Sequence, residues 1–188
     1  YAGKVKVSGT IDASGAAGGG DIKVTGEDIE VTNTAFVTAD ATNTGNGGSI
    51  YFMGGNKAIY SGNFAARGGL NGGNGGFVEL SAKNALGYDG AVTTMAVNGL
   101  AGSFLLDPEF AIIHSGWLDP ISWYDLIIKA ENLADDMHRN GTVTVQANQF
   151  IDVGTDLPFF GNGDINLATY NYQTWGVTGY INFFGVQI

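Results

Sequence analysis

Carboxylates are the residues of this 188-residue chain whose types and spacing could do chemistry. Paired acids cleave glycosidic bonds, because one donates a proton while the other acts as base or nucleophile. The groups of acids that are close in sequence are Glu27 with Asp28 and Glu30, Asp107 with Glu109, Asp135 with Asp136, and Asp152 with Asp156 and Asp164.

Most of these acids have a simpler structural explanation. The acids of residues 27–30 alternate across a strand and a turn, which is typical of a solvated face. Asp107 precedes Pro108 and is predicted to form a turn, whereas residues 135–136 are predicted to lie on the exterior of a helix. The acids between 152 and 164 are predicted on coils or corners that could converge. We predict no catalytic residue and no enzyme, with a polysaccharide-degrading or carbohydrate-binding protein as the alternative.

Other chemistries lack the residues that they need. The chain has no Cys, so thiolate and disulfide chemistry is excluded. His114 and His138 are not at metal-ligand spacing, and we predict no metal site. The glycine runs lack the Lys-Ser/Thr pair of a phosphate loop, and we predict no cofactor. A net charge of −10 with eight scattered Lys and Arg argues against nucleic acid as a partner.

Aromatic residues gather over residues 159–184, and we take them as the binding candidates. Exposed Tyr and Trp side chains stack on sugar rings or anchor protein interfaces. Alternatively, these rings fill the core of the last coils or cover an open end of the fold. The candidates for a surface or self-assembly contact are Tyr170, Tyr172, Trp175 and Tyr180.

Regular spacing of apolar residues predicts the fold that must position these side chains. Glycine accounts for 31 residues, and the glycine-rich stretches alternate with short apolar runs at a period of about 27 residues. The members of one series are Ile22, Ile50, Val78 and Leu105, and those of a second are Ile11, Val37, Phe64 and Val92. Short strands with period-2 alternation at constant spacing predict an all-β, parallel β-helix with ~27-residue coils. A disordered glycine-rich linker or a β-sandwich would not need such matched landmarks. We expect Gly and Asn at the corners, where positive φ is required.

The pattern divides the chain into three parts. Residues 1–116 are predicted to form regular glycine-rich coils, and residues 142–188 shorter, aromatic-rich coils. Between them, residues 117–141 are predicted to be a helical insertion, with a helix at about 130–139 that extends back toward 122. In the last part we take Val143, Ile165 and Ile181 as landmarks of successive coils, with a shorter and less regular period.

The stretch GGNGGFVELSAKNALGYDGAVTT…GLAGSFLLDPEF, residues 72–110, resembles the signature region of filamentous-haemagglutinin-like exoproteins. These are the large secreted partners of two-partner (type Vb) secretion. The matching positions are residues 72–76, Val78, Glu79, Ser81 and residues 105–108. The stretch AENLADDMHRNGTVTVQA, residues 130–147, is similar to the short helix and following strand of that family.

The resemblance implies a right-handed parallel β-helix on the bacterial cell surface or secreted from it. Family members act as adhesins, biofilm matrix proteins or carriers of contact-dependent toxins. The family's N-terminal secretion domain is not visible, so we expect an interior fragment that serves as a shaft or as a subunit of a surface filament. The expected partners are further copies in filaments, host-cell or matrix glycans and proteins, and an outer-membrane transporter during secretion.

Overall fold

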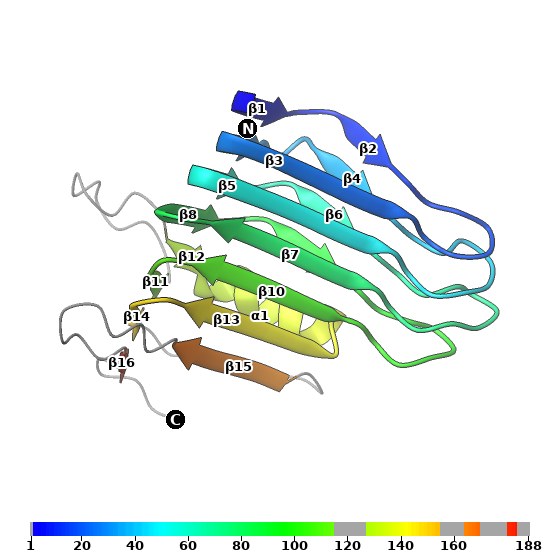
Figure 1. Cartoon of the computed structure of the whole chain (residues 1–188). Helices are drawn as coiled ribbons and strands as arrows, with labels where there is room; N and C mark the ends of the chain where they lie inside the picture. Colours follow the sequence, from blue (N-terminus) through cyan, green and yellow to red (C-terminus); the bar gives the residue numbers. More distant parts are fainter. Residues whose placement is uncertain (1, 115–126, 155–163, 170–179, 184–188) are drawn as a thin grey trace.

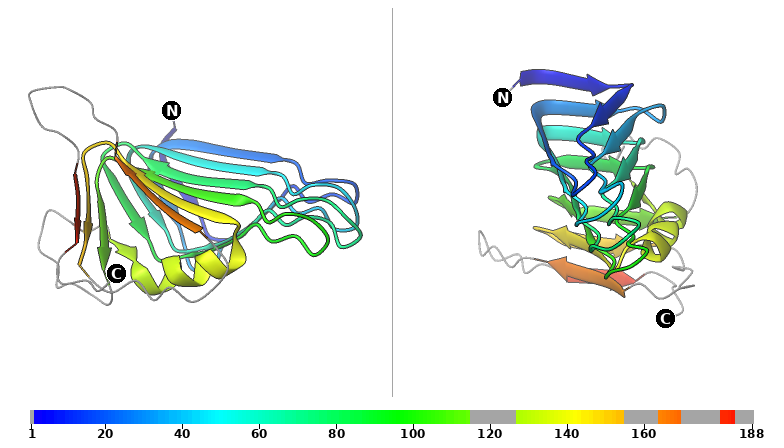
Figure 2. Two further views of the ribbon diagram at one scale, coloured as in Figure 1. Left: turned by 90° about the horizontal axis from the view of Figure 1, so that it is seen from below. Right: turned by 90° about the vertical axis from the view of Figure 1, so that its right-hand side faces the viewer.

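The chain winds into a parallel β-helix, as the repeat predicts, with about four turns of about 28 residues. The computed structural model describes residues 2–114, 127–154, 164–169 and 180–183. The coils stack from the N-terminal strand at one end to the last strands at the other (Figures 1 and 2). All strand pairs in the described residues are parallel, because the chain runs in the same direction along each face in every layer of the stack.

Two sheets and one helix make up the described part of the chain. The larger, 12-stranded sheet contains β1 (Ala2–Val7), β3 (Asp21–Val31), β5 (Ser49–Tyr60), β7 (Phe77–Ala82), β8 (Ala85–Tyr88), β10 (Ser103–Pro108), β11 (Ala111–His114), β12 (Ile128–Lys129), β13 (Thr142–Ala147), β14 (Phe150–Val153), β15 (Asp164–Thr169) and β16 (Tyr180–Phe183). The smaller, 4-stranded sheet contains β2 (Thr10–Asp12), β4 (Phe36–Thr38), β6 (Asn63–Ala65) and β9 (Ala91–Thr93). Helix α1 spans Ala130–Arg139.

The larger sheet covers two faces of the stack. The long strands β3 and β5 each cover both faces, whereas later coils divide this length between two strands, as β7 and β8 do. We call the surface formed by β7, β10, β13, β15 and the first halves of β3 and β5 the front face; it faces the viewer in Figure 1. The surface formed by β8, β12, β11, β14 and β16 is the side face.

Both series of apolar landmarks form columns inside the stack, with one correction. Strand pairing places Ile11, Val37, Phe64 and Val92 opposite one another in successive coils. The first series also stacks, but its fourth member is Phe104 and not Leu105. Leu105 pairs with Glu79 and points outward, while Phe104 and Leu106 are buried. Because three consecutive residues are apolar, the sequence does not show which of the alternating side chains in this strand point into the core.

Ile181 does not continue the column of Val143 and Ile165. Those two residues do pair with each other, in β13 and β15. Ile181 instead pairs with Ile151, because β16 lies beside β14 on the side face. The short 165-to-181 spacing therefore joins two faces and is not the length of a coil.

Helix α1 is shorter at its N-terminus than predicted. The prediction of a helix at 130–139 is confirmed, but Ile128 and Lys129 form strand β12. This strand pairs with β8 on one side and β11 on the other. The β-branched Ile128 is buried there, which favours a strand over a helical turn. Residues 122–126 lie outside the described residues.

A flat projection, which we call the glycine fin, consists of the stacked loops 13–20, 39–48, 66–76 and 94–102 (Figure 1, right). Each loop is closed at its base by a backbone hydrogen bond, such as Gly48 N–H to Ala39 O at 2.7 Å and Gly76 N–H to Ala66 O at 2.7 Å. Further bonds join neighbouring loops, such as Gly47 N–H to Asn74 O at 2.8 Å. The glycine runs are thus ordered layers.

Close stacking, more than backbone conformation, explains why these layers need glycine. A Cβ on Gly75 would overlap the Thr94 carbonyl and the Gly102 amide, which close the next loop. Gly47 and Gly19 occupy the equivalent position one and two coils earlier, respectively. Among the described glycines, positive φ is confined to Gly18, Gly45, Gly72 and Gly73. Our expectation that corners with positive φ explain the runs is therefore correct for only a few positions.

Candidate functional site

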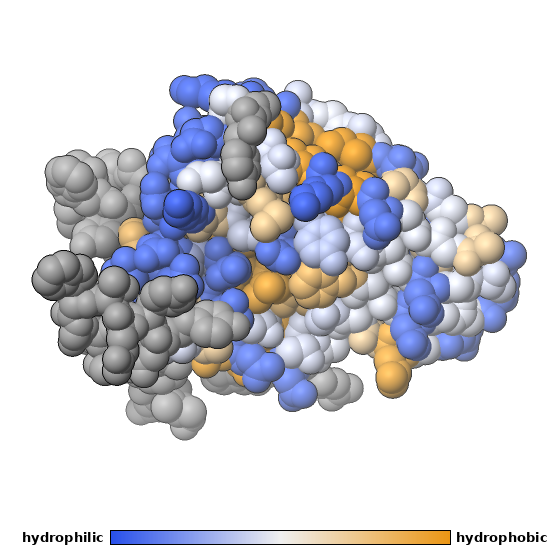
Figure 3. Space-filling view, in the orientation of Figure 1, coloured by the Kyte–Doolittle hydropathy of each residue, from blue (hydrophilic) through white to orange (hydrophobic). Residues whose placement is uncertain are grey.

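The front face carries a mixed aromatic and acidic patch, which we call the outer strip: Tyr51, Phe77, Glu79, Leu105 and Asp107. Alternation along β5, β7 and β10 turns these side chains outward, and pairing places Tyr51 beside Glu79 and Glu79 beside Leu105. The rings of Tyr51 and Phe77 lie 5.6 Å apart at 51°. In Figure 3, apolar surface lies in the middle of this face with hydrophilic surface beside it.

Carboxylates crowd one end of the outer strip. Burial raises the pKa of Asp107 most, and the nearby charges of Glu79 and Glu109 raise it further, although a hydrogen bond with Gln146 lowers it. Glu79 accepts a hydrogen bond from the Ser81 hydroxyl at 2.8 Å. Glu109 accepts hydrogen bonds from the side-chain amides of residues 148 and 149 at 2.9 and 2.8 Å. The strip therefore combines ring faces with hydrogen-bond acceptors, the groups with which proteins hold sugars.

The assignment of Asp107 to a turn is wrong. Asp107 and Pro108 both lie in β10, where they pair with Ser81 and Ala82 of β7. Pro108 is the last residue of this strand. The strand therefore carries Asp107 onto the front face beside Glu79, and the sequence signal for a turn was misleading.

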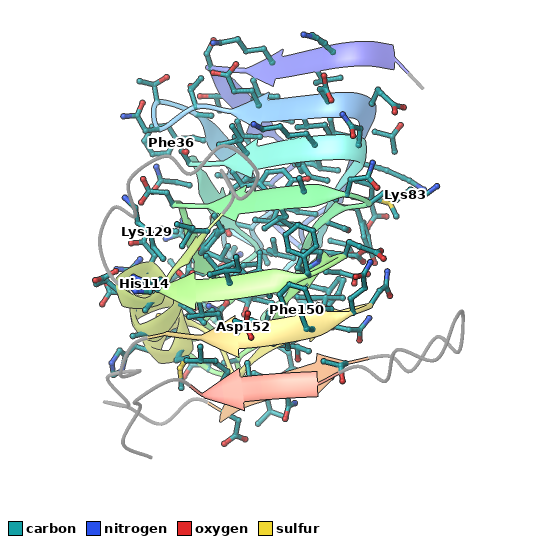
Figure 4. The ribbon with its side chains drawn as sticks, turned by 90° about the vertical axis from the view of Figure 1, so that its left-hand side faces the viewer. Phe36, Lys83, His114, Lys129, Phe150 and Asp152 are labelled. Atoms are coloured by element: carbon teal, nitrogen blue, oxygen red, sulfur yellow. The ribbon has the colours of Figure 1, made fainter. Side chains whose placement is uncertain are left out.

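The predicted aromatic contact lies mostly outside the described residues. Tyr170, Tyr172, Trp175 and the acid Asp156 belong to that undescribed part. Tyr180 is the first residue of β16, where its backbone pairs with Phe150 of β14. Phe150 lies on the side face and stacks on Phe110, with ring centroids 5.5 Å apart and an interplanar angle of 14° (Figure 4).

The remaining candidate acids and the two histidines are spread over different elements. Strand pairing places Asp152 opposite Ile112 and Asn182 on the side face, but Asp164 opposite Thr142 on the front face. His114 ends β11, and His138 is exposed on α1. The described residues contain no group of three His, Cys, Asp or Glu side chains that could hold a metal ion. None of the helices in the described part is long and apolar enough to cross a bilayer.

Asp136 is buried, which contradicts its predicted place on the exterior of the helix. Its carboxylate accepts a hydrogen bond from the Tyr88 hydroxyl and another from Val92 N–H at 2.8 Å. Asp135 does lie on the exterior and forms an ion pair with Arg139 at 3.6 Å. Burial is the main cause that raises the pKa of Asp136 to about 7, although the hydrogen bonds from residues 88 and 92 lower it.

Asp136 belongs to a polar stripe on α1 that bonds the edge of β9. Asn132 Nδ2 donates to Gly90 O at 2.7 Å, and Asn140 Nδ2 donates to Val92 O at 3.1 Å. Thr94 N–H also donates to Arg139 O at 3.0 Å. Residues 132 and 136 are spaced by four, so they share one face of the helix, and Asn140 follows directly after its last residue as the C-cap. That spacing of Asn, Asp and Asn was the sequence signal for this interface.

The fold defines the class of this protein as a parallel β-helix, and its front face carries the aromatic and acidic side chains of the outer strip. Comparison with protein-family models and with curated proteins finds no match for the chain.

Proposed function

We propose that the chain is a stiff, non-enzymatic segment of an extracellular protein, located on a bacterial cell surface or secreted, with a structural or adhesive role. The observation that carries this proposal is the unbroken parallel stack, in which the hydrogen bonds between strands run along the axis of the stack. The resemblance of residues 72–110 to filamentous-haemagglutinin-like exoproteins supports the location and the adhesive role. On the same basis, an outer-membrane transporter would be its partner during secretion.

Side chains add further links between coils and so support a mechanical role for the stack. At one corner, Asn56 Nδ2 donates to Asp28 Oδ1 at 2.8 Å, and Asn84 Nδ2 donates to Asn56 Oδ1 at 3.0 Å. At the base of the fin, the largely buried Asp40 accepts hydrogen bonds from the backbone and the guanidinium of Arg67, both at 2.6 Å. Such ladders resist separation of coils, because every layer is bonded to the next.

Electron microscopy of the protein at the surface of its producing cell tests this proposal. We expect thin rods or filaments whose density repeats every ~4.8 Å along the axis, the spacing between stacked strands. Protease treatment of intact cells should remove them. Compact particles inside the cell would contradict the proposal, and so would release of reducing ends from polysaccharides by the purified chain.

Filaments and single rods have different implications for the partner. Filaments with a regular repeat would assign self-association to the chain, whereas isolated rods would make it one segment of a longer shaft. A heterologous contact between the two ends of the stack would build an open filament, because it leaves one free end of each kind.

The aromatic pair of the outer strip favours a second candidate function, a contact with glycans. Tyr51→Ala removes one of two neighbouring rings, so we expect about tenfold weaker binding to a neutral polysaccharide, equivalent to a loss of ~1.4 kcal/mol. Phe36→Ala is the matched control, because Phe36 is an exposed ring on the smaller sheet with 52% of its surface accessible (Figure 4). Affinity electrophoresis in polysaccharide gels would measure both, and equal retardation of the two variants would contradict a contact at the strip.

A further inference from the structure

Helix α1 covers the edge of the smaller sheet. Strand β9 is the last strand of that sheet, and α1 packs on it in the position where a further strand would pair (Figure 2). The side chains of Asn132, Asp136 and Asn140 bond the backbone of residues 90–92 in place of a strand. Edge strands left open are sites of unwanted pairing, so this cover protects the sheet.

The middle bond of this cover is made by a carboxyl group that is completely removed from water. Asp136 is 0% exposed, and its neighbour Tyr88 is 1% exposed. Burial and the charge of Asp136 raise the pKa of Tyr88 well above its ordinary value, so the hydroxyl remains a neutral hydrogen-bond donor. The carboxyl of Asp136 is therefore the buried group in this interface that changes charge in the neutral range.

Charged groups around this carboxyl do not neutralise it. On α1 itself, Arg139 favours its ionised form and Asp135 opposes it, but these two side chains are paired with each other and partly exposed. Asp89 is paired with Lys129 of β12 at 2.7 Å. Strands β9 and β13, which also pack against α1, contain no acidic or basic residue. No cation among the described residues forms a hydrogen bond or ion pair with Asp136.

We propose that α1 is a pH-dependent clasp on the edge of β9. The helix stays docked on β9 while Asp136 carries a proton, and docking weakens when the buried carboxyl loses that proton. Loss of the proton leaves a negative charge that is buried away from water with no cation bonded to it, a state that is relieved when the helix moves away from the strand. Release of the clasp exposes the backbone of β9 to solvent.

The direction of the pH effect follows from the two states of the clasp. When α1 is undocked and Asp136 is solvated, its pKa is near the ordinary 3.8, and when α1 is docked it is about 7. Below pH ~4 both states are protonated, and docking has its full strength. As pH rises from ~4 to ~7, only the undocked state loses its proton, so docking weakens by up to tenfold per unit. Above pH ~7 the loss is complete, at roughly a thousandfold.

Hydrogen exchange at β9 tests this proposal. The amides of Val92 and Thr94 are bonded by Asp136 and by the Arg139 carbonyl of α1, so they report directly on docking. After correction for the intrinsic pH dependence of exchange, we expect their protection factors to fall by one hundredfold or more between pH 4.5 and pH 8. The amide of Phe52, in the middle of the larger sheet, should show no such fall. An unchanged protection factor for Val92 would overturn the proposal.

Two variants separate Asp136 from other titrating groups. Asp136→Asn keeps an acceptor for Val92 N–H but cannot ionise, so the protection factors should become independent of pH. Tyr88→Phe removes a bond that lowers the pKa of Asp136, so the fall should extend to higher pH, which keeps the test open if the first variant fails to fold. His138 is the histidine of α1, and His138→Gln should leave the wild-type fall intact. A fall that persists in Asp136→Asn, or one that disappears in His138→Gln, would overturn the proposal.

Discussion

Gly75→Ala is expected to reduce the free energy of unfolding by more than ~3 kcal/mol, the range in which backbone clashes and strained sites fall. The added Cβ would overlap the Thr94 carbonyl and the Gly102 amide in the next layer of the glycine fin. Those groups form the 2.8 Å hydrogen bond that closes the loop, so neither can move without breaking it. Urea unfolding followed by the circular dichroism of the strands would measure the loss.

Gly9→Ala is the matched control for this substitution. No atom lies within 4 Å of a Cβ built on Gly9, and its φ is not positive. We therefore expect a change of less than ~0.5 kcal/mol, and a slight gain is consistent with a stiffer unfolded chain. Equal effects at Gly75 and Gly9 would show that the fin is not closely stacked in solution.

Phe64→Ala is expected to cost ~3–5 kcal/mol of the free energy of unfolding, because it opens a cavity in the centre of the stack. The Phe64 ring is 1% exposed and meets the rings of Phe52 and Tyr60 edge to face, with centroids 5.5 and 6.3 Å away. Aromatic pairs of this geometry add stability beyond the apolar area that they bury. Thermal and urea unfolding would both show the loss.

Phe36→Ala separates this packing from the mere loss of a ring. Phe36 pairs with Asn63, the neighbour of Phe64, but its side chain points away from the stack (Figure 4). We expect Phe36→Ala to cost less than ~1 kcal/mol, as for other exposed positions. A loss at Phe36 as large as at Phe64 would mean that the inward and outward parity of the smaller sheet is reversed.

The sequence was sufficient to predict the period and most of the interior columns. Ile11, Val37, Phe64 and Val92 each lie in a short alternating run, so parity and spacing agree. The inward or outward direction of the side chains was predicted wrongly only at residues 104–106, where three apolar residues follow one another. The place of Ile181 failed for another reason: both faces of the larger sheet use the same apolar alternation, and local pattern does not state which face a strand belongs to.

Burial of single polar residues was harder to predict than the repeat. Asp135 and Asp136 are adjacent and identical in type, but their side chains point about 100° apart around the helix, and only one meets β9. The face of α1 that turns inward is set by β9, a strand that ends more than 35 residues before the helix begins. Val92 of β9 and Asp136 of α1, which form a hydrogen bond, are 44 residues apart in sequence. The outer strip was missed for a similar reason, because Tyr51, Glu79 and Asp107 become neighbours only through stacking.

Strand β12 has a consequence for the order in which the stack can be completed. Elsewhere on the two faces each new strand pairs with the one made a coil earlier, so assembly can follow synthesis. Strand β11 is made before β12, yet β12 lies between β11 and β8. This layer therefore cannot be closed in chain order: β11 has its native neighbour on that side only after residues 128–129 have been made and inserted. On the side face the β-helix is a sequential template up to β8, and beyond that strand the assembly of this face must wait for the chain to return.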